Sequence, residues 1–186
     1  LNPILVDLYD ASGHFDILQN MPYLKKLSLA FTKRNHQESM IECGRELNKN
    51  TNITQLSINF GPNSHLQDDL LKNLIDLKLR KLELFLINEV PRYDYLKHFG
   101  PTLISLTLII RDVESYDSEF HISKLKRLQE FNVSFEGVIN QEYLISYMMK
   151  LAQIMSNFPH LKKFSLRSES EAGLDLFFQD IEKIPH

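Results

Sequence analysis

Few side chains in this sequence could carry chemistry, and they are spread along its whole length. The seven histidines are His14, His36, His65, His98, His121, His160 and His186. A zinc site on a helix needs two histidines four residues apart, and no pair of these histidines has that spacing. Surface histidines, or histidines in ordinary hydrogen bonds, are the expected interpretation, and no metal site is predicted.

Cys43 is the one thiol of the chain. A cysteine nucleophile needs a neighbouring base and an accessible cleft. Cys43 instead belongs to an apolar helical pattern with Ile41 and Leu47, which predicts a small side chain in the hydrophobic core. A single cysteine also leaves no partner for an internal disulfide.

The carboxylates and glycines form no recognisable catalytic arrangement. Asp68 and Asp69 are the only adjacent acidic pair, and their position on a helical face predicts that water solvates both. Glu169 and Glu171 are expected to be solvated in the same way. The six glycines stand apart from one another, so no phosphate-cradling loop is predicted. We therefore expect no catalytic residue, no cofactor and no enzyme activity.

The charge balance argues against a general affinity for nucleic acid. The 21 basic and 24 acidic residues give a formal net charge of -3, without the global basic field common in nucleic-acid-binding domains. Short basic clusters stand at Lys33 and Arg34, at 124–127, and at Lys162 and Lys163. These clusters could meet phosphate or an acidic partner, although a solvated surface is the commoner reason for such clusters.

The elements that position these side chains come from an internal repeat. The pattern Leu-x-x-Leu-x-Leu, with apolar substitutes, occurs at 24–29, 53–58, 79–84, 103–108, 128–133 and 161–166. Its middle apolar residues are Leu27, Leu56, Leu82, Leu106, Phe131 and Phe164, so successive copies are 29, 26, 24, 25 and 33 residues apart. A seventh, weaker unit is expected at the front, where Val6 and Leu8 would occupy the same two apolar positions.

The apolar period changes within each repeat. Around each motif apolar and polar residues alternate, as in Leu27, Leu29 and Phe31, which predicts a half-buried strand. Between the motifs helical spacing predicts helices over 35–50, 65–77, 93–99 and 140–158. A further helix is expected at 169–186, where it would cap the open end of the core. Strands that alternate with helices imply a parallel sheet, because parallel neighbours need a crossover.

The segments YLKKLSLAF, NITQLSINF, PTLISLTLII and HLKKFSLRS resemble the strands of the leucine-rich repeat superfamily, over nearly the whole chain. The resemblance implies an α/β solenoid of about six to seven irregular repeats, with a parallel sheet on the concave face and helices on the convex face. Many members of the family carry Asn or Cys three residues after the last Leu of the motif, where these side chains form a ladder along the solenoid, and this chain lacks that ladder. Inward apolar residues one position earlier are expected to take its place; these are Phe31, Phe60, Leu86, Ile110 and Phe135.

The outward residues of the strands form the candidate binding surface, because side chains alternate across a sheet. Most of them are small and polar, but Phe85 and Ile109 are apolar and occupy consecutive repeats. Apolar neighbours on a polar sheet are a candidate anchor for a partner, unless a flanking loop covers them. The residues predicted to contact a partner on the concave face are Lys81, Glu83, Phe85, Thr107, Ile109 and Asn132.

Residues 1–186 are expected to form one repeat domain, and because the sequence starts at Leu1 instead of methionine, we expect it to be a fragment of a longer protein. Three functional hypotheses follow. The first is a protein-interaction module, and the repeats resemble those of F-box proteins, which implies the substrate-recognition part of a ubiquitin ligase adaptor. The second is a subunit of a nucleic-acid-associated complex, in RNA export or on chromosomes. The third is a regulatory domain that binds an enzyme. The lack of disulfide-stapled caps and of a signal pattern favours an intracellular location, cytoplasmic or nuclear.

Overall fold

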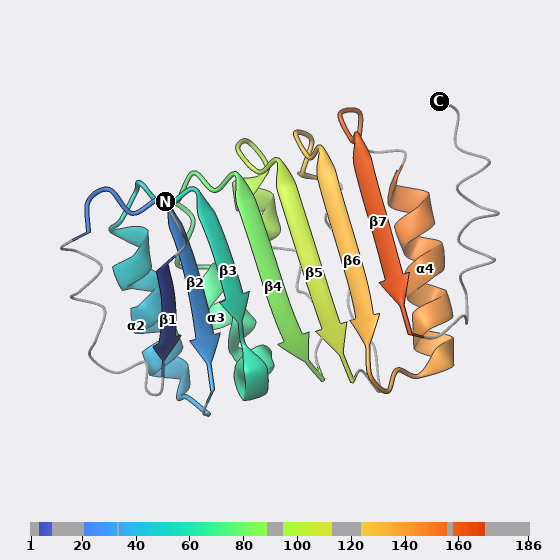
Figure 1. Cartoon of the computed structure of the whole chain (residues 1–186), viewed down its shortest axis with the longest axis horizontal. Helices are drawn as coiled ribbons and strands as arrows, with labels where there is room; N and C mark the ends of the chain where they lie inside the picture. Colours follow the sequence, from blue (N-terminus) through green and yellow to red (C-terminus); the bar gives the residue numbers. More distant parts are fainter. Residues whose placement is uncertain are drawn as a thin grey trace.

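The computed structural model describes residues 4–8, 21–32, 34–88, 95–112, 124–155 and 158–169. Its strands form one parallel sheet in sequence order (Figure 1). They are β1 (Ile4–Leu8), β2 (Lys26–Phe31), β3 (Gln55–Asn59), β4 (Lys81–Ile87), β5 (Ser105–Arg111), β6 (Glu130–Glu136) and β7 (Lys163–Ser168). Each strand therefore pairs with the strand of the next repeat, and the predicted α/β class with a parallel sheet is confirmed.

The register of the sheet follows the repeat. Leu56 of β3 pairs with Leu27 of β2 and with Leu82 of β4, and the same position continues through β5 and β6 to Phe164 of β7. The front unit also exists as β1, but its predicted alignment was wrong: Val6 pairs with Leu29, two residues further along than expected. A shift of two residues keeps the same side chains on the same face of the sheet, so the alternation alone could not detect it.

The connections behind the sheet are less regular than their sequence periods predict. The structure contains α2 (Gln37–Asn48), the 3-10 helix η1 (Gly61–Leu66), α3 (Gln67–Leu71), the 3-10 helix η2 (Leu96–Phe99) and α4 (Gln141–Met155). The helix expected over 65–77 was wrong in length, because α3 ends at Leu71. After α3 the chain makes two turns, which are closed by hydrogen bonds from the Leu74 N–H to Leu71 O and from the Leu77 N–H to Leu74 O. These turns place buried side chains inward, at Leu74, Leu77 and Leu79. The capping helix expected at 169–186 lies outside the described residues beyond Glu169.

The core lies between the inner face of the sheet and these connections. The added inward residues Phe31, Phe60, Leu86, Ile110 and Phe135 are at most 1% exposed, which confirms their predicted role. The rings of Phe31 and Phe60 lie 6.1 Å apart, and Phe135 of β6 meets Tyr147 of α4 edge to face at 4.9 Å. Buried apolar side chains, aromatic and aliphatic, thus occupy the place of a polar ladder.

A local polar network still closes the turn after β3. The Asn63 side chain is fully buried; its Oδ1 accepts a hydrogen bond of 2.6 Å from the Asn35 backbone, and its Nδ2 donates to Phe60 O. The neighbouring Ser64 Oγ accepts a 2.8 Å bond from the Ile87 backbone N–H. These two side chains satisfy backbone groups of three repeats at a point where an unpaired amide would be costly.

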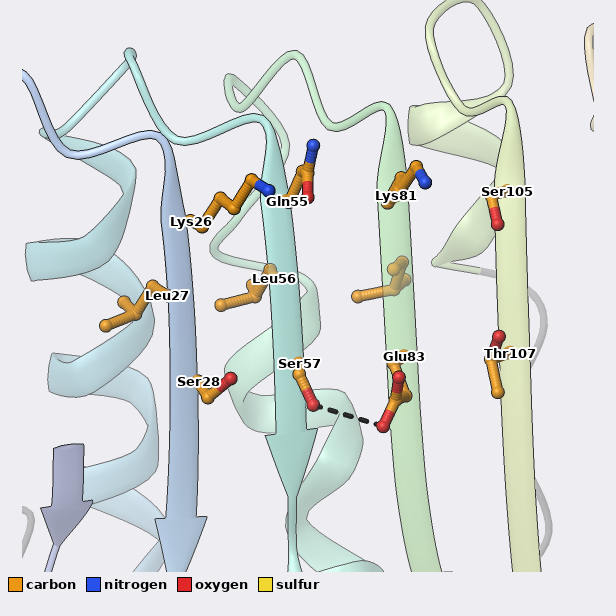
Figure 2. A pocket seen from close by; sticks show the side chains of 11 residues that line it. Lys26, Leu27, Ser28, Gln55, Leu56, Ser57, Lys81, Glu83, Ser105 and Thr107 are labelled. Atoms are coloured by element: carbon orange, nitrogen blue, oxygen red, sulfur yellow. Dashed lines mark hydrogen bonds between the residues drawn. The ribbon is translucent and has the colours of Figure 1, made fainter. Parts of the chain in front are cut away.

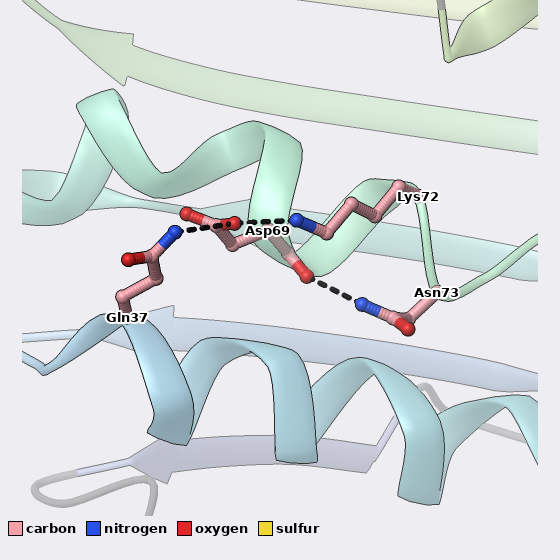
Figure 3. A network of polar contacts seen from close by, with 4 residues as sticks. All are labelled: Gln37, Asp69, Lys72 and Asn73. Carbon is pink, nitrogen blue, oxygen red and sulfur yellow. Dashed lines mark hydrogen bonds and ion pairs between the residues drawn. The ribbon is translucent and has the colours of Figure 1, made fainter.

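Asp69 links two helices of adjacent repeats (Figure 3). Its Oδ1 accepts hydrogen bonds from Gln37 Nε2 of α2 at 3.1 Å and from Lys72 Nζ at 2.6 Å. Burial alone would raise the pKa of the Asp69 carboxyl, but the hydrogen bonds from Lys72 and Gln37 outweigh it, so this pKa lies below its usual value. The expectation that water solvates Asp69 was wrong, because the helix of the previous repeat packs over it.

Replacement of Asp69 by Asn should lower the free energy of unfolding by about 1–3 kcal/mol at neutral pH, because the charged acceptor is lost. A carboxyl with a depressed folded-state pKa stabilises the protein above its unfolded pKa of about 4, and that stability disappears as the pH falls through the folded-state pKa. The difference between wild type and Asp69→Asn in urea denaturation should therefore shrink as the pH falls below about 4. A difference that stays constant from neutral to acid pH would contradict this assignment.

Gly44 is the closest contact between α2 and the next repeat. A Cβ at this position would lie 2.6 Å from Leu70 O and 2.8 Å from Asn73 Cβ. Because Leu70 O belongs to the backbone, Gly44→Ala must push the two helices apart, and we expect it to cost about 1–3 kcal/mol despite alanine's higher helix propensity. Thermal unfolding of Gly44→Ala beside the exposed control Arg45→Ala checks this prediction, and a stabilised Gly44→Ala would show that the helices are looser than described.

Candidate partner-binding face

The outer face of the sheet is a broad surface that the described helices leave open. Figure 1 looks onto it, with α2 and α3 behind the strands and no described helix across the front. Along β4 the inner residues are buried and the outer ones are exposed or half-buried, and the central strands share this pattern except at Ser105 of β5, which is buried. The outer side chains form rows across the sheet, because the parallel register aligns equivalent positions.

A hollow of about 320 Å³ lies on this face near the starts of β2 to β5 (Figure 2). Its outward side chains are Lys26, Ser28, Gln55, Ser57, Lys81, Glu83, Ser105 and Thr107. Small hydroxyl residues form its floor, while Lys26 and Lys81 stand at the strand starts with Gln55 between them. The row Ser28, Ser57, Glu83 and Thr107 consists mostly of short side chains, whereas the row at the strand starts contains the longer Lys26, Gln55 and Lys81.

The chemistry available in the hollow is recognition by charge and hydrogen bonds. Its lining contains neither histidine nor cysteine, and its one carboxylate, Glu83, is exposed and accepts a hydrogen bond of 3.4 Å from Ser57 Oγ. Such a long, exposed bond does not activate a serine hydroxyl as a nucleophile. Two lysines, several hydroxyls and an amide can instead bind polar or anionic groups of a partner.

The six residues predicted as the binding site divide into two groups on this face. Lys81, Glu83 and Thr107 line the hollow. Phe85 and Ile109 lie further along β4 and β5, directly paired in register and both half-buried, so the two residues are neighbours on the sheet as expected. Asn132 of β6 joins the first group, since its Nδ2 donates a hydrogen bond of 3.3 Å to Thr107 Oγ1.

Arg111 and Glu136 belong to the same surface, although neither was among the predicted site residues. The Arg111 guanidinium lies 5.1 Å from the centre of the Phe85 ring, and its Nη2 forms an ion pair of 2.7 Å with Glu136 Oε2. The guanidinium therefore covers part of the ring and is held there by Glu136. Both residues continue the outward alternation of their strands, so the same period could have identified them.

The described residues offer little else that could act chemically. They contain no group of three or more histidine, cysteine or acidic residues that could hold a metal ion. Cys43 is fully buried, as its helical pattern predicted, and burial raises the pKa of its thiol. Among the helices in the described part of the chain, none has the length and apolar character needed to cross a bilayer.

Comparisons with known proteins show a likeness to solved structures. No family model and no curated protein matches the chain. Among solved structures, it is similar to the leucine-rich repeat-containing protein LegL7 from Legionella pneumophila, with a TM-score of 0.49 and 12% sequence identity. The match covers 95% of this chain and 60% of LegL7, so this chain spans little more than half the length of that protein.

Proposed function

We propose that this chain is a leucine-rich-repeat solenoid that binds another protein on the outer, concave face of its sheet. The observation that supports this most is the apolar pair Phe85 and Ile109, adjacent on consecutive strands and only half-buried on a face whose other outer positions are mostly polar. A half-buried aromatic ring beside an arginine is typical of the residues that contribute most to protein interfaces. The hollow beside the pair supplies hydrogen-bonding groups around this centre.

The geometry of the face favours a protein over a small molecule. The hollow is open to solvent, whereas small-molecule sites are mostly enclosed. An extended row of outer positions over at least β2 to β6 matches the breadth of a protein surface. We therefore propose a non-catalytic module in which the apolar pair anchors the partner and the hollow orients it.

Two more specific predictions, an F-box-like ubiquitin ligase adaptor role and an intracellular location, rest on the sequence alone. The adaptor role rests on the resemblance of the repeats, and both stay predictions. If the chain is the recognition part of such an adaptor, the captured protein should become ubiquitylated more slowly when Phe85 is replaced by Asp in the full-length protein. A regulatory domain that binds an enzyme would use the same face, and the identity of the partner would distinguish the two.

The first experiment is affinity capture from a cell extract with the wild-type chain and with Phe85→Asp/Ile109→Asp. We expect the wild type to retain a protein at high salt that the double variant does not retain. Met149→Asp is the matched control, because Met149 is 41% exposed on α4, away from the outer face. Equal retention by all three chains would refute a role for the apolar pair.

A further inference from the structure

The fold collects basic residues from separate chain segments at one edge of the sheet. All strands are parallel, so their starts lie along one edge, the upper edge in Figure 1. Backbone hydrogen bonds join the residues just before the strands: Lys25 O accepts from Gln55 N–H, and Arg80 O accepts from Ser105 N–H. The turns that enter successive strands are therefore neighbours in space, although about 25–30 residues separate them in sequence.

The turns and first strand residues at this edge carry far more basic than acidic side chains. Glu130 is the one acidic residue in these segments, which are 22–26, 51–55, 77–81, 100–105, 124–130 and 159–163. The basic residues are Lys25, Lys26, Lys78, Arg80, Lys81, Lys124, Lys126, Arg127, Lys162 and Lys163. We call these ten residues the basic edge.

The basic edge is open to solvent. All ten side chains are exposed, and none forms an ion pair with a described carboxylate; Arg127 Nη1 donates to Pro101 O at 3.0 Å. The opposite ends of the described strands carry Asp112, Glu136 and Glu169 beside Arg111 and Arg167, so basic and acidic side chains are mixed there, whereas the strand starts are mainly basic. Unpaired like charges along one line repel one another, and an anionic ligand relieves that repulsion.

The spacing of the basic edge fits an extended chain. The basic residues gather before β2, β4, β6 and β7, whereas the segments before β3 and β5 are uncharged. Alternate strands are about 10 Å apart, because neighbours are about 4.8 Å apart. A peptide in the extended polyproline II conformation advances about 3.1 Å per residue with three residues per turn, so acidic side chains at every third position share one side and lie about 9–10 Å apart, close to the separation of alternate strands.

We propose that the basic edge binds an extended acidic segment of the protein partner. This inference rests on the proposed function and specifies the partner's chemistry. Lys26 and Lys81 belong both to the basic edge and to the hollow, so a segment along the edge would be continuous with a partner seated on the outer face. The partner's acidic segment would contribute mainly to the association rate and to specificity, because exposed ion pairs contribute little affinity each.

The same edge is poorly suited to single-stranded nucleic acid. Such ligands stack successive bases on several aromatic side chains beside a basic groove. In the six edge segments Tyr23, which is 87% exposed, is the one aromatic residue, and it stands at one end. An acidic peptide needs no such stacking platforms.

The test uses a fluorescein-labelled peptide of four Glu-Ser-Gly repeats and measures its binding to the chain by fluorescence anisotropy at low salt. The edge variant is Lys78→Glu/Lys126→Glu, and the control with the same change of net charge is Arg34→Glu/Arg167→Glu, at exposed positions near the opposite ends of β2 and β7. We expect at least about a tenfold weaker affinity for the edge variant and about a twofold change or less for the control. Carbodiimide cross-linking should join the peptide to lysines of the basic edge rather than to Lys72, which is paired with Asp69.

Three results would overturn the inference: no measurable peptide binding by the wild type, equal weakening in both variants, or tighter binding of a dodecamer of deoxythymidine that is lost in the edge variant. The last result would identify a nucleic-acid site instead. Failure here is distinguishable from failure of the proposed function. If the edge variant captures the same protein with wild-type affinity while Phe85→Asp/Ile109→Asp does not, the outer face binds a protein and the basic edge does not contribute.

Discussion

Truncation of Phe135 to Ala is expected to lower the free energy of unfolding by about 3–5 kcal/mol, the largest effect of any single change proposed for this chain. The Phe135 ring is 1% exposed on the inner face of β6, and it meets Tyr147 of α4 edge to face, with the ring planes at 82°. Its removal leaves a cavity between sheet and helix and also eliminates the aromatic contact. Urea denaturation followed by circular dichroism measures the loss.

Phe135→Leu is the matched control, because it keeps an apolar side chain of intermediate volume at the same place. Its cost should be clearly smaller than that of Phe135→Ala, since less of the cavity is created. If the two variants lose the same stability, or if Phe135→Ala loses less than about 1 kcal/mol, the added inward position does not hold α4 against the sheet in the way described.

The second large effect concerns binding. Phe85→Asp/Ile109→Asp should weaken the affinity for the captured and purified partner by at least about thirtyfold, because hot-spot residues typically contribute about 2 kcal/mol or more. The stability cost should be smaller than that of Phe135→Ala, about 1–2 kcal/mol, since both side chains are only half-buried and aspartate is mainly a poor strand former. Calorimetric titration gives the affinity, and thermal unfolding gives the stability.

The affinity and the stability of the double variant together separate an interface effect from a folding effect. Met149→Asp should leave both the affinity and the stability close to wild type, because the side chain is exposed on α4. Loss of affinity in the double variant with retained cooperative unfolding assigns the effect to the interface. An affinity within about threefold of wild type would show that the apolar pair is not the anchor, since that change is less than 1 kcal/mol.

Much of the fold could be predicted from the sequence because the strands repeat a period of two. Leu82, Leu106 and Phe131 occupy equivalent positions in their repeats, and the register pairs them. The inward position of Phe135 followed from the same alternation. The alignment of β1 could not be predicted, because a shift of two residues preserves which face each side chain occupies.

The connections were less predictable because packing between repeats overrides local helical propensity. The sequence period of 65–77 suits a helix throughout, but the burial of Leu74 and Leu77 requires turns after Leu71. Asp69 resembled a solvated carboxylate for a similar reason: its partner Gln37 comes from a different repeat, 32 residues away. Contacts of this kind depend on which helices are neighbours, and this is decided at the level of the whole sheet.

For the candidate site, alternation predicted which residues face outward and that Phe85 and Ile109 are neighbours. It did not indicate that the Arg111 guanidinium lies over Phe85, because that placement depends on a rotamer and on the ion pair with Glu136. The basic edge was visible only as separate clusters, since its members come from different turns. The parallel register is what assembles them.

Site-directed photo-cross-linking tests the central claim most directly. A benzoylphenylalanine is placed at Thr107, on the outer face between the hollow and the apolar pair, or at Met149 on α4, and each chain is irradiated with the captured partner. A protein partner on the outer face predicts a covalent adduct from position 107 and none from position 149. An adduct from position 149 alone would place the partner on the helical side and contradict the account.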